Sequence, residues 1–137
     1  MPSVSIETVT LLARIAFWAG AVTDALAILP MLSRRVGVAL FGGDPAGDSA
    51  EYRFAMGIGA SLMAGWTMLL FWGLGSPIER RGLLLLTICP VIAGIVMATV
   101  IAARRGVVLV PRLIPLWIHL GVLSAFYGLV YILAGLP

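Results

Sequence analysis

The chain has 137 residues, of which 61% are hydrophobic and 11% are charged, and its formal net charge is +3. Soluble domains are about half apolar and about one quarter charged, and a domain of this size cannot bury so much apolar surface in water. An ordinary soluble domain is therefore excluded. The nine basic residues are all arginines scattered between apolar runs, unlike the continuous basic face that binds nucleic acid.

The first apolar run, residues 15–32, contains a single charged residue, Asp24. Arg14 precedes the run, and Arg34 and Arg35 follow it. A helix of this length spans about 27 Å, against about 30 Å of hydrocarbon in a bilayer. The run predicts a spanning helix with Asp24 near the middle of the membrane.

Residues 33–52 form the longest predicted connection. Its residues 36–41 are apolar, and we expect them in the membrane interface, whereas residues 42–47 have the glycine and proline content of turns. Asp48, followed three residues later by Glu51, predicts the N-cap of the second spanning helix.

Three further runs are long enough to span a bilayer, and none contains an acid or an arginine: residues 54–74, 82–103 and 113–136. Pro90 is expected to kink the second of these. Because short loops join antiparallel neighbours, the sequence predicts an all-α fold. This fold is one transmembrane domain over residues 1–137, an up-down-up-down bundle of four helices.

Arginines are unequally divided between the two ends of this bundle. One end, with the connections at residues 33–52 and 104–112, holds six: Arg34, Arg35, Arg53, Arg104, Arg105 and Arg112. Because cytoplasmic loops carry an excess of basic residues, we expect both connections in the cytoplasm of a bacterial inner membrane. Anionic lipid headgroups are the expected partners of Arg34, Arg35, Arg104 and Arg105.

Asp24 is the most informative residue, because a carboxyl group at mid-membrane is costly and usually faces a bundle interior, a cavity or a partner. It shares a helix face with Gly20 and Ala16, where another helix can approach closely. Two interpretations are open. Asp24 either forms a protonatable or ligand-binding site, or is a neutral side chain hydrogen-bonded to a neighbouring helix.

Polar side chains of the last helix are the other candidates for a proton or ligand site. His119 lies at a depth compatible with Asp24, although a bond to a backbone carbonyl or a headgroup is its simpler role. Ser124, Tyr127 and Tyr131 share one helix face. They either line a polar cavity or hydrogen-bond to other helices.

Gly57, Ser61 and Gly65 form a ridge of small residues that predicts close helix packing, by default within the chain. Cys89 and His119 occur alone in separate runs and cannot build a zinc or two-histidine haem site. The sequence therefore predicts no metal and no cofactor.

The segment GWTMLLFW at residues 65–72, followed by PIERRG at residues 77–82, resembles small bacterial four-helix integral membrane proteins of uncharacterised function. The resemblance implies a bacterial origin and four helices.

Three functions compete. The favoured one is a non-enzymatic bundle, either an accessory subunit of a larger membrane complex or a binder of a lipid or hydrophobic ligand. A small homo-oligomeric transporter using Asp24 as a proton or cation site is the second. A lipid-modifying membrane enzyme using Asp24, His119 and Tyr127 as acid–base groups is the third.

Overall fold

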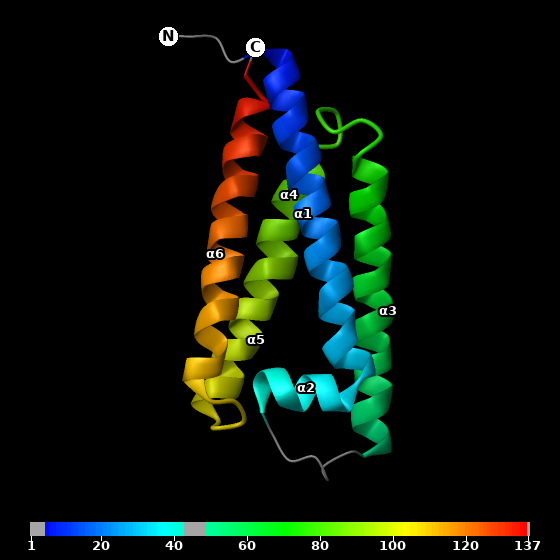
Figure 1. The fold of residues 1–137 in the computed structure, drawn as a ribbon, viewed down its shortest axis with the longest axis vertical. Helices are drawn as coiled ribbons and strands as arrows, with labels where there is room; N and C mark the ends of the chain where they lie inside the picture. Colours follow the sequence, from blue (N-terminus) through cyan, green and yellow to red (C-terminus); the bar gives the residue numbers. More distant parts are fainter. Residues whose placement is uncertain (1–4, 43–48, 137) are drawn as a thin grey trace.

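The computed structural model describes residues 5–42 and 49–136. Every regular element in this part of the chain is a helix, and four spans are long and apolar enough to cross a bilayer: α1 (Ile6–Leu32), α3 (Ala50–Gly73), Gly82–Arg104 and α6 (Val110–Leu133). Successive spans run in opposite directions (Figure 1). The all-α transmembrane four-helix bundle is confirmed, and the chain is a multi-pass membrane protein.

Helix α1 begins nine residues before the apolar run that predicted it, at Ile6 rather than residue 15. The Ser5 side chain caps it by accepting a hydrogen bond from the Thr8 backbone N–H at 3.2 Å. Hydropathy marks only the part of a helix that matches the membrane, so the predicted start was wrong. Arg14 consequently lies inside α1 and not at its boundary.

The connection predicted at residues 33–52 contains a helix of its own, α2 (Arg34–Phe41). It crosses one end of the bundle, steeply inclined to the spanning helices (Figure 1), and contacts α1 and α6. The Arg112 guanidinium of α6 donates to the Val38 carbonyl of α2 at 3.4 Å. Gly42 ends the helix with a φ of 82°, a conformation that favours glycine.

The start of α3 corrects a second expectation. Ser49 is the N-cap, and its hydroxyl accepts from the Tyr52 N–H at 3.1 Å. The sequence predicts Asp48 as the cap, and Asp48 lies outside the described residues. Serine and aspartate are about equally good caps, so the pattern located the helix start but not the capping residue.

The third span consists of three segments, α4 (Gly82–Leu86), η1 (Thr87–Ile92) and α5 (Ala93–Arg104). The middle segment is a π-helix that contains Pro90. Proline has no N–H to donate and its ring crowds the preceding turn, and wider π turns often accompany such interruptions. The predicted irregularity at Pro90 is therefore a local widening of the helix.

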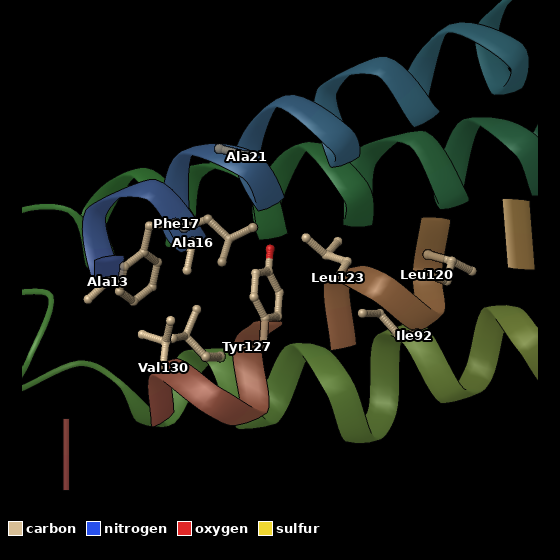
Figure 2. Packing of buried hydrophobic residues seen from close by; sticks show 11 residues of the cluster. Ala13, Ala16, Phe17, Ala21, Ile92, Leu120, Leu123, Tyr127 and Val130 are labelled. Atoms are coloured by element: carbon tan, nitrogen blue, oxygen red, sulfur yellow. The ribbon is translucent and has the colours of Figure 1, made fainter. Parts of the chain in front are cut away.

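The core lies where α1 meets α6 and α3. Small side chains of α1 let the larger side chains of α6 approach, and Figure 2 shows Tyr127 and Val130 facing Ala13, Ala16 and Phe17. Helices α4 and η1 cover the other side of α6. The interior of the bundle is thus centred on Tyr127, which is fully buried.

Candidate functional site

Asp24 lies inside the bundle, with 6% of its surface exposed. Ala16 and Gly20, on the same face of α1, are also buried. One carboxylate oxygen, Oδ2, is buried without a hydrogen-bond partner among the described residues. Buried polar atoms are paired in the great majority of cases, so an unpaired one requires an explanation.

Tyr127 of α6 is the second unpaired group. Its ring is fully buried, and its hydroxyl has no hydrogen-bond partner in the described part of the chain. Figure 2 shows the hydroxyl pointing from α6 toward α1. There it meets Gly20, since a Cβ atom built at Gly20 would overlap the Tyr127 oxygen. Gly20 therefore makes the space for the hydroxyl, one helical turn from Asp24.

The packing of α1 on α3 sets what lies opposite Asp24. Leu70 approaches Gly20, and its Cδ1 would lie 3.1 Å from a Cβ atom at that position. The two helices are antiparallel, so one turn further along α1 corresponds to one turn back along α3. Asp24 accordingly lies at the level of Trp66 and Thr67.

Each of the four spans contributes one buried polar side chain: Asp24 from α1, Thr67 from α3, Thr87 from η1 and Tyr127 from α6. The two threonines are satisfied. Thr67 donates to the Met63 carbonyl at 2.9 Å, and Thr87 donates to the Leu83 carbonyl at 2.8 Å. Only Asp24 and Tyr127 keep unpaired polar atoms, which singles out this pair.

Thr87 also accepts a hydrogen bond from the Trp66 indole N–H at 3.2 Å, which ties α3 to η1. The sequence pattern assigns no role to Thr67 or Thr87. The available signal was a threonine within an apolar run, but such residues also occur on lipid-facing surfaces. Burial identifies them only once the helices are assembled.

His119 lies on the outer side of the seam between α1 and α6. Its imidazole Nε2 is 3.2 Å from the Thr23 hydroxyl, and the histidine is exposed. Thr23 is rotated about 100° around α1 from Asp24. His119 therefore meets the residue beside Asp24 and not Asp24 itself, and its partner within the described chain is the Thr23 hydroxyl.

The other candidates on α6 diverge. Ser124 is half-buried, and Tyr131 is half-buried at the end of the bundle, where the Arg81 guanidinium lies 5.9 Å from its ring. Arg81 also donates to the Ala134 carbonyl at the end of α6. The stripe of Ser124, Tyr127 and Tyr131 thus brings one hydroxyl into the core and one to the end of the bundle.

The ridge of Gly57, Ser61 and Gly65 lies on the outer face of α3. A Cβ atom built at Gly57 or Gly65 meets nothing of the described chain within 4 Å, and Ser61 is exposed and donates to the Gly57 carbonyl at 2.9 Å. The intrachain partner expected for this ridge is absent from the described helices. Gly20, by contrast, is at a close helix contact.

Among residues 5–42 and 49–136, no group of three or more His, Cys, Asp or Glu side chains could hold a metal ion. No family model, curated protein or solved structure matches the chain. The pair formed by Asp24 and Tyr127 is the strongest candidate site.

Proposed function

We propose that this chain is a small membrane carrier that binds and releases a proton at Asp24, with Tyr127 as the neighbouring hydroxyl. One observation carries the proposal: the Tyr127 hydroxyl lies against Gly20, one helical turn from the buried Asp24 carboxyl, and each group has a polar atom without a partner in the described chain. An unsatisfied buried polar atom costs about 1–3 kcal/mol. Ionisable residues within a membrane span are rare and commonly mark proton and ion pathways.

A proton suits this site better than a metal cation. Calcium takes about six to eight oxygen ligands, whereas the pair offers two carboxylate oxygens and one hydroxyl. An ionised carboxylate without a cation or donors beside it is strongly disfavoured in an apolar interior. We therefore expect Asp24 to carry a proton in this sealed conformation.

The surroundings of Asp24 contain few groups that compete for that proton. On α6 the titratable groups nearby are Tyr127 and, outside the seam, His119. On α3 the residues opposite are Trp66 and Thr67, which do not titrate in water. Arg14 is ten residues away along α1, about 15 Å by helical rise. A change in proton occupancy at this depth therefore belongs to Asp24 or to His119, and replacing Asp24 by asparagine separates the two.

Proton exchange requires the seal around Asp24 to open. The element suited to this is η1, because a π-helix lacks the regular hydrogen bonding of its neighbours and such segments are frequent at functional sites. Its residue Ile92 is buried in the core beside Leu120 and Leu123 of α6 (Figure 2). Movement of η1 would uncover the side of the core that Tyr127 occupies.

A transport path needs more room than one four-helix bundle provides, so the carrier is proposed to be a homo-oligomer. The oligomer is proposed to lie in a bacterial inner membrane with α2 and the loop at residues 105–109 on the cytoplasmic side. Six arginines gather at that end, and Arg35, Arg104 and Arg105 are exposed there. Arg34 lies over the Tyr52 ring at 4.9 Å. Anionic headgroups are the proposed partners of these arginines.

The competing functions make different demands on Asp24. An accessory subunit or hydrophobic-ligand binder would use it only for packing. A lipid-modifying enzyme would need Asp24, Tyr127 and His119 on one cavity, and His119 instead bonds to Thr23 on the outside of the seam.

The test is proton movement in proteoliposomes that contain a pH-sensitive dye. We expect a pH step to drive proton flux through the wild-type protein and not through Asp24→Asn. Glu79→Gln is the matched control, because Glu79 is an exposed acid in the loop after α3. Infrared spectroscopy should also show the carbonyl band of a protonated acid that Asp24→Asn alone removes. Equal flux in all three proteins, with no such band, would establish Asp24 as a packing residue.

A further inference from the structure

The outer side of α1 carries two adjoining hollows that belong to no part of the proton site. The larger, about 600 Å³, is open, runs along α1 from Leu11 to Thr23 and is lined mainly by Ile15, Trp18 and Val22, with Arg14 near one end. The smaller, about 270 Å³, lies nearer the helix start and is lined by Glu7, Thr10 and Arg14 among others. Arg14 borders both hollows.

Charges in the two hollows follow a fixed order along the helix. The larger hollow is mainly apolar between Thr23 and Arg14, and the smaller adds Glu7 about 10 Å further toward the start of α1 by helical rise, with the apolar Leu11 between the two charges. Helical side chains lean toward the N-terminus, so the Arg14 guanidinium extends toward the level of Glu7. No described residue forms an ion pair or hydrogen bond with Arg14.

The dimensions match one leaflet of a bilayer. Arg14 and Thr23 are separated by about 13.5 Å along the helix axis, and one leaflet contributes about 15 Å of hydrocarbon. Trp18 is exposed beside the apolar stretch and packs edge-on against Phe71 of α3, with ring centroids 5.3 Å apart. Its ring is therefore held as a fixed wall of the larger hollow.

We propose that this surface binds phosphatidylethanolamine. The acyl chain lies along Ile15, Trp18 and Val22, the phosphate accepts hydrogen bonds from Arg14, and the primary ammonium donates to Glu7. The order apolar, cationic, anionic along α1 is the complement of the order acyl chain, phosphate, ammonium in that lipid. Guanidinium and phosphate form strong charge-assisted hydrogen bonds, and an ammonium group offers three donors to a carboxylate.

The proposal is independent of proton binding, because it uses the outer face of α1 and leaves Asp24 untouched. It also differs from ordinary interfacial anchoring by arginine and tryptophan, which any phospholipid satisfies. The distinguishing feature is Glu7. A primary ammonium can donate hydrogen bonds to it, a choline headgroup cannot, and phosphatidylglycerol carries no cation.

Native mass spectrometry of the full chain released from mixed micelles measures which lipids are retained. The micelles contain equal amounts of phosphatidylethanolamine, phosphatidylglycerol and phosphatidylcholine. We expect the wild type to retain phosphatidylethanolamine preferentially. Glu7→Gln should abolish the preference over phosphatidylglycerol, and Arg14→Gln should reduce retention of phosphatidylethanolamine, because the phosphate loses its guanidinium partner. Arg105→Gln, an exposed arginine at the other end of the bundle, is the matched control.

Two outcomes would overturn the proposal. One is equal retention of all three lipids, which would show ordinary annular lipid only. The other is a wild-type preference that persists unchanged in both Glu7→Gln and Arg14→Gln. Both substituted side chains are exposed, so the variants should fold, and circular dichroism of each sample verifies this.

Discussion

Replacement of Gly20 by alanine tests the contact at the centre of the candidate site. The added methyl group would overlap the Tyr127 hydroxyl oxygen and would lie 3.1 Å from Leu70 Cδ1. Both neighbours are fully buried. Gly20→Ala should therefore destabilise the bundle, although alanine favours a helix over glycine by about 1 kcal/mol.

The magnitude follows from the cost of overpacking, about 1–3 kcal/mol for an extra methyl group in a well-packed interior. In the Tyr127→Phe background the overlapping oxygen is gone. The nearest remaining atoms are the ring Cζ at 3.2 Å and Leu70 Cδ1 at 3.1 Å, which need to yield only slightly. Most of the cost should then disappear, so the two substitutions should be coupled by about 1–2 kcal/mol.

Reversible unfolding of the detergent-solubilised protein by sodium dodecyl sulfate measures these free energies. Gly65→Ala is the control, because a Cβ atom at Gly65 meets nothing within 4 Å in the described chain. It should be neutral or slightly stabilising. If Gly20→Ala behaves like Gly65→Ala, or costs the same with and without the Tyr127 hydroxyl, the close contact between α1 and α6 is refuted.

Three further predictions concern single contacts and use the same unfolding assay. Gly73→Ala should lower the free energy of unfolding by about 1–3 kcal/mol, because the added Cβ would lie 2.6 Å from Cδ1 of the fully buried Phe17 ring. A neutral result would mean that α1 and α3 are further apart at this point. Thr87→Val should cost about 1–3 kcal/mol by leaving the Trp66 indole N–H without its acceptor, and adding Trp66→Phe should recover part of this. Arg81→Met should cost about 1.5–3 kcal/mol, because the Arg81 guanidinium donates a hydrogen bond to the Ala134 carbonyl, and it should speed amide exchange near Ala134. Arg105→Met, which replaces an exposed arginine, should have neither effect.

Much of the architecture could be predicted from hydropathy and length. Four apolar runs indicated four spanning helices, and Asp24 stood out as the one acid among them. The helix ends were less predictable. The start of α1 and the helix α2 lie in segments with too few apolar residues to signal a span, and cap hydrogen bonds that involve Ser5 and Ser49 decide where α1 and α3 begin.

The candidate site could be predicted only in part. Asp24 and Tyr127 were both singled out, but the residue that the sequence suggested as a partner for Asp24 was His119. The structure brings Tyr127 against Gly20 and gives His119 to Thr23. Thr67 and Thr87 gained significance only from their burial.

The sequence by itself determined that the chain crosses a membrane and roughly where, because the bilayer selects for length and apolarity in each segment separately. Only the tertiary structure decided which side of each helix faces inward. Gly20 and Gly65 look alike in the sequence, yet one lies beneath a tyrosine and the other meets no described residue. Lipid tails are as apolar as leucine, so the contrast between apolar and polar faces that orients helices in water is missing, and close packing of specific side chains orients them instead.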